Sequence, residues 1–143
     1  MQLPAVMLLA GVMILAVHQP LVWLLHRASV TPWRGFDLTP IAPFRLPALV
    51  SAVFWGAVWG PIIAWLGRRD GSPVRHARAA IWAAVLTTVV GIVLVAFGHG
   101  QRIAAASAGT AVAASLLVNG IWSFATSVAI AWLGARSDTT TTL

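Results

Sequence analysis

Four long apolar stretches occupy most of this chain and constrain its fold more than any motif does. They run from Leu3 to Leu25, from Leu46 to Leu66, from Ala79 to Gly98 and from Ala104 to Leu133. The hydrocarbon core of a bilayer is about 30 Å thick, and a helix of about 20 predominantly apolar residues crosses it. We therefore predict an all-α fold, a transmembrane four-helix bundle that forms one membrane domain over residues 1–143.

The composition also indicates a membrane environment. Hydrophobic residues make up 59% of the chain and charged residues only 8%, whereas soluble domains carry about 25% charged residues. Because so few charges cannot cover a water-soluble fold, we expect the lipid bilayer to surround most of the surface. The formal net charge is +6, and arginines supply all of its positive charge. They lie in loops or near the ends of the apolar stretches, where lipid phosphates are found, so we expect no nucleic-acid partner.

The first apolar stretch is interrupted by the sequence His18-Gln19-Pro20. Proline lacks a backbone N–H and clashes with the preceding turn, so we expect a kink near Val17. Histidine and glutamine inside a membrane helix face protein or water rather than lipid. His18 is therefore a candidate haem ligand, proton relay or substrate contact, or a structural residue that bonds a carbonyl or Asn119.

The chain offers few groups for catalysis or metal binding. It has no cysteine, and its three acidic residues are aspartates in loops or in the tail. Metal sites need clustered carboxylates, thiolates or imidazoles, and a serine nucleophile needs a base beside it. His26, His76 and His99 lie at the predicted membrane boundaries, where we expect solvated histidines. We therefore predict no metal, no cofactor and no enzymatic activity.

The segment between the first two spans, residues 28–47, holds four prolines. Prolines at this density prevent a regular helix and favour extended or turning backbone. The pattern allows two arrangements. The segment lies along the membrane interface, anchored by Trp33 and Phe36, or it folds over the mouth of the bundle as a cap.

The second apolar stretch contains Gly56 and Gly60 in a GxxxG pattern. This pattern lets a neighbouring helix approach closely. Trp55 and Trp59 have the same spacing on an adjoining ridge. The two tryptophans either belong to this close helix contact or build an aromatic pocket for a lipid, quinone or cationic ligand.

The fourth apolar stretch carries small and weakly polar residues at every fourth position. Such a row forms a shallow groove into which another helix packs. Asn119 lies near the middle of the span and needs a polar partner there. We expect the threonine-rich residues 137–143 to form a disordered tail. The row consists of Ser107, Ala111, Ser115, Asn119, Ser123 and Ser127.

The ends of the second and fourth stretches resemble each other. Residues 63–69 read IAWLGRR and residues 130–136 read IAWLGAR, so six of seven positions agree at an offset of 67 residues, and Trp55 aligns with Trp122. The similarity arises from duplication of a two-helix hairpin, giving two parallel two-helix repeats, or from convergent use of common helix-end residues. In both cases aromatic and arginine side chains anchor the helix ends at the interface. These anchors are Trp65, Arg69, Trp132 and Arg136.

The loop charges favour one orientation. The short connection between the second and third spans holds Arg68, Arg69, Arg75 and Arg78. Cytoplasmic loops of membrane proteins are rich in basic residues. We therefore place this connection and both termini in the cytoplasm, with the protein in the bacterial inner membrane.

Part of the chain resembles a known group of proteins. The His18-Gln19 pair, His26 at the end of the first span, the proline-rich segment and the sequence FWGAVWG over residues 54–60 carry the resemblance. They are similar to small four-helix integral membrane proteins of proteobacteria, a group of unknown function. The resemblance implies an inner-membrane location and no particular activity.

Two functions fit these features. The protein is a structural or accessory subunit that packs through its small-residue helix faces with itself or with a larger membrane protein complex, or it is a carrier or binding protein for a small molecule or lipid. The small-residue faces favour the first interpretation. The packing residues are Gly56, Gly60, Ser107, Ala111, Ser115 and Ser123, and the pocket candidates are His18, Gln19, Trp55, Trp59 and Asn119.

Overall fold

The computed structural model describes residues 1–41, 44–67, 72–98 and 105–139. It is mostly helical, which confirms the helical part of the predicted fold class. Two short strands form an antiparallel hairpin, with Pro40 opposite Pro47 and Ile41 opposite Leu46. The elements in chain order are α1 (Leu3–Met13), a π-helical turn η1 (Ile14–His18), α2 (Gln19–Arg27), β1 (Pro40–Ile41), β2 (Leu46–Pro47), α3 (Ala48–Gly67), α4 (Pro73–Gly98) and α5 (Ala105–Thr139).

Three helices are long and apolar enough to cross a membrane. They are the continuous first helix Leu3–Arg27, then Ala48–Gly67 and Ala108–Ala135. The span predicted at 79–98 lies within α4, which is not among the three that qualify in the part of the chain that the structure describes. The four-helix transmembrane bundle therefore stays a prediction.

The first helix contains an irregularity just before Pro20, where the sequence predicts a kink. Residues 14–18 form the π-helical turn η1 between α1 and α2. The ring of a proline crowds the carbonyl of the preceding turn, and a π turn, which is wider than an α turn, relieves such crowding. His18 ends this turn and Gln19 begins α2, so the irregular backbone sets the direction of both polar side chains.

Helix α1 packs mainly against α3, and glycines on α3 make the close approach possible. Gly56 and Gly60 are both buried. A Cβ atom at Gly56 would overlap the side chain of Ile14, and one at Gly60 would lie 2.7 Å from the Cβ of Ala10. The GxxxG pattern of the second span is therefore covered by the first helix of the same chain.

Helix α5 packs mainly against α4, and the row of small residues on α5 faces the interior. Ala111, Ser123 and Ser127 are buried. A Cβ atom at Gly120 would meet Ala84 of α4 at 3.7 Å. Ser107 belongs to α5, but its side chain lies outside the described part of the chain.

The centre of the molecule is filled by Trp122 of α5. This side chain is only 1% exposed and is the largest of the fully buried side chains. It belongs to a core cluster with Ile14 of η1, Ile63 of α3 and Ala83 of α4. The Trp122 side chain thus joins the pair formed by the first helix and α3 to the pair formed by α4 and α5, because it packs against residues from both pairs.

Two helices depart from their predicted boundaries. Helix α4 begins at Pro73, within the predicted loop, because the Ser72 carbonyl accepts backbone hydrogen bonds from Arg75 and His76 and because proline is favoured in a first helical turn. Helix α5 continues to Thr139, so the first residues of the predicted disordered tail are helical. Residues 140–143 of that tail lie outside the described residues.

The early start of α4 brings His76 into the bundle, which corrects the expectation of a solvated histidine. His76 is buried, and its Nδ1 atom lies 2.7 Å from the hydroxyl oxygen of Ser127. His26 is half-buried, with its Nδ1 atom 3.2 Å from the Thr31 carbonyl oxygen. His99 lies outside the described residues.

Of the four predicted interface anchors, only the two tryptophans have side chains in the described part of the chain. Trp65 is 69% exposed and Trp132 is 54% exposed. Arg69 lies outside the described residues, and the side chain of Arg136 lies outside them as well. The aligned pair Trp55 and Trp122 have opposite environments, since Trp55 is exposed and Trp122 is fully buried.

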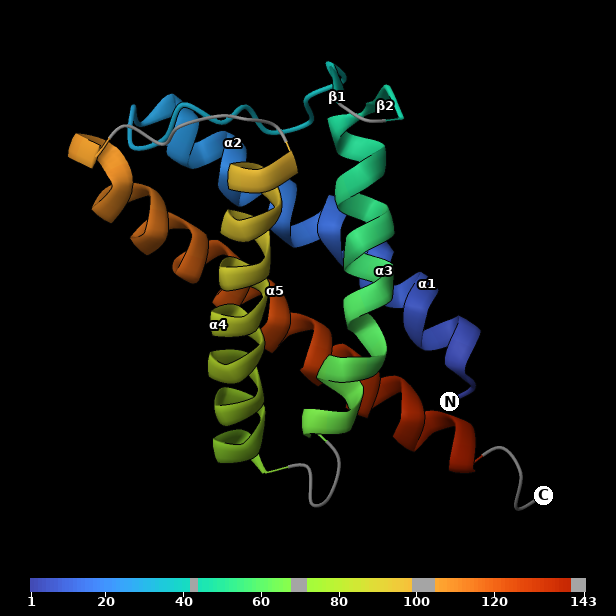
Figure 1. Ribbon diagram of the computed structural model, residues 1–143. Helices are drawn as coiled ribbons and strands as arrows, with labels where there is room; N and C mark the ends of the chain where they lie inside the picture. Colours follow the sequence, from blue (N-terminus) through green and yellow to red (C-terminus); the bar gives the residue numbers. More distant parts are fainter. Residues whose placement is uncertain (42–43, 68–71, 99–104, 140–143) are drawn as a thin grey trace.

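Figure 1 shows how the two ends of the molecule differ. The N-terminal end of α1 and the C-terminal end of α5 lie toward the end where α3 finishes and α4 begins. The end of α2, the β hairpin and the start of α5 lie at the opposite end. We call this second end, with residues 28–41 and the β hairpin, the loop end.

Candidate ligand-binding pocket

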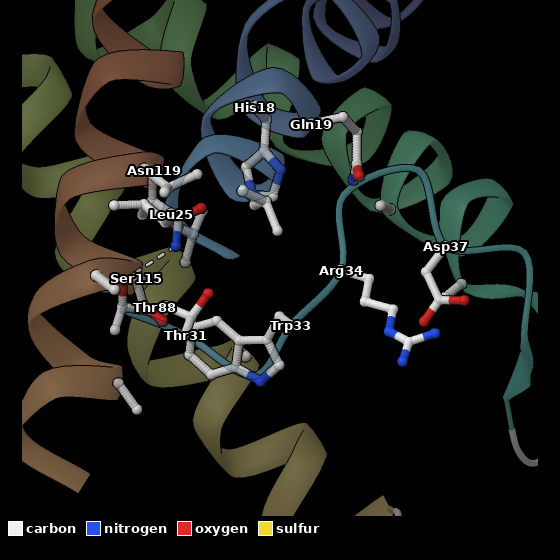
Figure 2. Close-up of a pocket in the computed structure, with 18 of the residues that line it drawn as sticks. His18, Gln19, Leu25, Thr31, Trp33, Arg34, Asp37, Thr88, Ser115 and Asn119 are labelled. Atoms are coloured by element: carbon white, nitrogen blue, oxygen red, sulfur yellow. Dashed lines mark hydrogen bonds between the residues drawn. The ribbon is translucent and has the colours of Figure 1, made fainter. Parts of the chain in front are cut away.

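A cavity of about 340 Å³ lies among the helices at the loop end. Its wall is built by α2, α3, α4 and α5, and residues of the loop after α2 close one side (Figure 2). Most of the wall is apolar and includes Val22, Leu25, Leu49, Ile92 and Val118. Polar side chains gather in two places.

The first group, which we call the inner polar cluster, consists of His18, Thr88 and Asn119. The Asn119 amide nitrogen donates a hydrogen bond to the Thr88 hydroxyl at 3.1 Å. The His18 side chain lines the same part of the cavity wall, so three helical segments contribute one polar group each (Figure 2). The Nδ1 atom of His18 is buried and has no hydrogen-bond partner among the described residues, and the His18 ring lies edge-on to Trp122 with 6.4 Å between the ring centroids. The cluster thus offers neutral donors and acceptors inside an apolar wall.

The second group lies on the loop and comprises Arg34 and Asp37, which we call the charged rim, with Trp33 beside it. All three side chains line the cavity (Figure 2). The Thr39 side chain and the Thr39 backbone N–H, 2.9 Å from Asp37 Oδ1, donate hydrogen bonds to the Asp37 carboxylate. These bonds hold the pKa of Asp37 below its ordinary value, and the positive charge of Arg34 acts in the same direction. The rim therefore presents one cation and one anion.

The loop is fixed to the helices on both sides of the cavity. The Phe36 backbone N–H donates to Oε1 of the buried Gln19 at 2.7 Å. On the other side, the Leu49 N–H of α3 donates to the Asp37 carbonyl oxygen at 2.8 Å. That bond also satisfies one of the backbone donors that the first turn of a helix leaves unpaired.

Gly35 lets the loop lie directly on α2. A Cβ atom there would stand 2.6 Å from the Gln19 carbonyl oxygen and 2.7 Å from the Trp23 backbone nitrogen. The next residue, Phe36, has a φ angle of 57°, a left-handed conformation that few bulky residues adopt. The hydrogen bond to Gln19 maintains this backbone, so the path of the loop is defined by its contacts with α2.

Three of the five predicted pocket residues line the cavity, and two do not. His18, Gln19 and Asn119 contribute to the wall. Trp55 lies outside the cavity wall, exposed, with its ring edge-on to Phe54 at 5.7 Å. Trp59 packs against the core cluster. The segment between the first spans borders the cavity through Thr31, Trp33, Arg34 and Asp37, as a cap would, and its position relative to the membrane interface stays a prediction.

Several wall residues were not singled out from the sequence. Thr87 and Thr88 form the only pair of adjacent threonines in the otherwise apolar 79–98 stretch, and this polarity is a signal that points to an interior face. The Thr87 hydroxyl donates to the Ala83 carbonyl at 2.7 Å, whereas that of Thr88 accepts from Asn119. Arg34 and Asp37 carried a weaker signal, since charges in a loop are ordinary.

The site offers hydrogen-bonding groups, charges and apolar contacts. Among the described residues, no group of three histidine, cysteine, aspartate or glutamate side chains could hold a metal ion. The cavity combines apolar walls, a neutral hydrogen-bonding cluster and a pair of opposite charges at its rim. Such a combination suits an amphiphilic molecule with a polar head and an apolar body.

Comparison of the chain with protein-family models, with curated proteins and with solved structures finds no match.

Proposed function

We propose that this protein binds a small amphiphilic molecule in the cavity at the loop end, as a membrane-embedded binding protein or carrier. The observation that carries the proposal is the cavity of about 340 Å³, bordered by the loop after α2 and lined by His18, Asn119 and Thr88. Small-molecule pockets are typically apolar clefts of about 300–1,000 Å³ with a few placed polar groups. The cavity has this size and this mixture.

The inner polar cluster supports the same proposal. A polar group in the interior of a membrane protein is costly unless the protein or a ligand partners it. Asn119 uses its amide nitrogen on Thr88, and the Thr31 hydroxyl is buried in the cavity wall without a hydrogen-bond partner among the described residues. Asn119, whose side-chain oxygen is an acceptor, lines the cavity and offers a bound molecule a polar contact.

Packing with a partner through small-residue faces, the alternative function, has less support. Gly56 and Gly60 are covered by α1, and Ser123 and Ser127 are buried beneath neighbouring helices. A face that is already covered within the chain is not available to another protein. The small residues therefore explain how this chain closes on itself.

For the membrane arrangement, we extend the proposal to a four-helix bundle in the bacterial inner membrane, with α4 as the remaining span. The charge of the α3–α4 connection supports cytoplasmic termini. In that orientation the cavity opens on the opposite side of the membrane, because the loop end lies away from the ends of α1 and α5 (Figure 1).

The test is to fill the cavity without disturbing the helices. Gly91 of α4 lines the cavity, and a Cβ atom there meets nothing within 4 Å. Gly109 of α5 is equally open but lies outside the cavity wall. We expect Gly91→Phe to lower the amount of small molecule or lipid that co-purifies in mild detergent by about tenfold, a loss of about 1.4 kcal/mol in binding.

Gly109→Phe is the matched control and is expected to retain the bound molecule. Native mass spectrometry of the intact protein measures the bound mass, and circular dichroism confirms that both variants fold. The proposal fails if the wild-type protein carries no bound molecule, or if Gly91→Phe carries as much as Gly109→Phe.

A further inference from the structure

The rim of the cavity carries two opposite charges that do not neutralise each other by direct contact. Arg34 and Asp37 are three positions apart on one loop, and both line the cavity. They interact through space, and no hydrogen bond of the Arg34 guanidinium is found among the described residues. The Arg34 guanidinium therefore keeps its donors for a further group, and the Asp37 carboxylate, which already accepts from Thr39, keeps part of its accepting capacity. In Figure 2 the two side chains lie near each other on the loop side of the cavity.

The fold holds these charges in place. The loop between them is tied to α2 through the hydrogen bond from Phe36 to Gln19, and to α3 through the bond from Leu49 to Asp37. The Asp37 carboxylate is oriented by Thr39. Side chains placed before a ligand arrives lose little entropy on binding, so a pre-arranged charge pair favours one ligand geometry.

A ligand that fits both charges must itself carry a cation and an anion at one end. A phosphate matches the planar fork of the Arg34 guanidinium, and an ammonium matches the Asp37 carboxylate. The apolar wall behind the rim then takes part of an alkyl chain. The geometry points to a zwitterionic phospholipid with a phosphoethanolamine head as the ligand of this cavity.

The rim also discriminates against anionic lipids. A lipid whose head carries only a negative charge can pair its phosphate with Arg34. It has no cation for Asp37, so the phosphate and the Asp37 carboxylate repel each other. The net effect is selection between lipids of the same membrane by the charge of the head. This inference rests on the proposed function, since it names the ligand of the same cavity.

The experiment uses the full-length protein in nanodiscs that contain equal amounts of phosphatidylethanolamine and phosphatidylglycerol. After the protein is released from the nanodiscs, native mass spectrometry measures which lipid stays bound to it. We expect the wild-type protein to retain phosphatidylethanolamine about tenfold over phosphatidylglycerol, the effect of one charge-assisted hydrogen bond. Asp37→Asn is expected to remove the preference and keep lipid bound, whereas Arg34→Gln weakens retention of both lipids.

Arg45→Gln is the matched control, because Arg45 is an exposed arginine of the same inter-helix segment that does not line the cavity. It should behave as the wild-type protein does. Equal retention of the two lipids by the wild-type protein overturns the inference, as does an unchanged preference in Asp37→Asn. Displacement of the lipid by an equal concentration of soluble phosphoethanolamine also overturns it, because the lipid chains would then contribute nothing.

The Gly91→Phe variant separates this inference from the proposed function. If the wild-type protein retains both lipids equally and Gly91→Phe loses both, the cavity binds lipid and only the selection by head charge is wrong. If Gly91→Phe retains lipid as the wild-type protein does, the cavity is not the binding site and both proposals fail.

Discussion

In the described parts of α4 and α5, two hydrogen bonds between side chains join the helices, and their surroundings differ. His76 lies 2.7 Å from the Ser127 hydroxyl, and Asn119 donates to Thr88 at 3.1 Å. Around the first contact the helices close tightly, since a Cβ atom at Gly67 of α3 would stand 2.6 Å from the Ser127 hydroxyl. Around the second contact the same two helices border the cavity.

The difference shows two uses of polar residues in an apolar bundle. In lipid, a buried polar group needs a partner from the protein or from a ligand. At the closed contact, two side chains satisfy each other and small residues seal the surrounding space. At the open contact, alanines such as Ala111 and Ala114 line a volume that no neighbouring side chain fills. We call the tightly packed part of the bundle, with the His76–Ser127 contact and the α1–α3 contact, the closed half. We call the part around the cavity, with its loop, the open half. We infer that the closed half stabilises the fold and that the open half holds the proposed ligand.

The largest expected effect comes from breaking the close packing on which the closed half depends. In Gly56→Leu the new side chain would overlap Ile14 of η1. Overpacking of a well-packed core costs about 1–3 kcal/mol and occasionally more. We expect the free energy of unfolding to fall by about 3 kcal/mol, measured by titration of the detergent-solubilised protein with sodium dodecyl sulfate and followed by circular dichroism.

Gly109→Leu provides the control for this substitution, because a Cβ atom at Gly109 meets nothing within 4 Å. A surface change of this kind is expected to alter the free energy of unfolding by no more than about 0.5 kcal/mol. Equal losses in the two variants would show that the α1–α3 contact does not determine stability. The distinction between a closed and an open half would then lose its energetic basis.

The sequence predicted that glycines would allow a close contact, but not which helix would make it. In these membrane helices nearly every position is apolar, so periodicity does not separate the buried face from the lipid face. Trp55 and Trp122 illustrate this point, since both occur in similar apolar contexts and only Trp122 is buried. Polar residues are better guides, because lipid excludes them, and His18, Gln19 and Asn119 all line the cavity.

The cap could not be derived from the sequence alone. The prolines between α2 and α3 exclude a helix, but they do not set the direction of the chain. That direction depends on the bond from Phe36 to Gln19 and on the close approach of Gly35 to α2, both of which form only in the folded molecule. Arg34 and Asp37 reach the cavity only because the loop follows this path.

A smaller effect is expected from loosening the cap of the open half. In Gly35→Ala the new Cβ would lie 2.6 Å from the Gln19 carbonyl oxygen, and backbone atoms cannot move aside as a flexible side chain can. The loop must lift from α2, at a cost of about 1–2 kcal/mol. We expect faster amide hydrogen exchange at Phe36 and weaker retention of the bound molecule, with exchange measured by mass spectrometry.

The matched control is Gly109→Ala, in which a methyl group is added to an open position of α5. Its exchange at Phe36 should equal that of the wild-type protein. Unchanged exchange at Phe36 in Gly35→Ala would mean that the loop does not rest on α2, and that the charged rim is not held in place by the fold.

The smallest expected effect concerns the charge of the rim. The Thr39 side chain is the main cause of the low pKa of Asp37, and the Thr39 backbone N–H contributes next. Thr39→Ala removes the hydroxyl and keeps the backbone donor, so the pKa of Asp37 should rise part of the way toward the ordinary value of about 3.9. Carboxyl-carbon NMR of labelled protein measures this titration, with Thr110→Ala, at an exposed position of α5, as the control.

The sign of the accompanying stability change follows from the lowered pKa. A carboxyl group with a lowered pKa in the folded state stabilises the fold above its ordinary pKa, and the contribution is lost as the pH falls through the folded value. In Thr39→Ala this contribution should therefore be smaller, and its loss should be complete at a higher pH. Because Asp37 is solvated, this change in stability should be far smaller than that of either glycine substitution. An unchanged pKa in Thr39→Ala would show that the hydroxyl is not the main cause and would assign the effect to the backbone N–H of residue 39 and to Arg34.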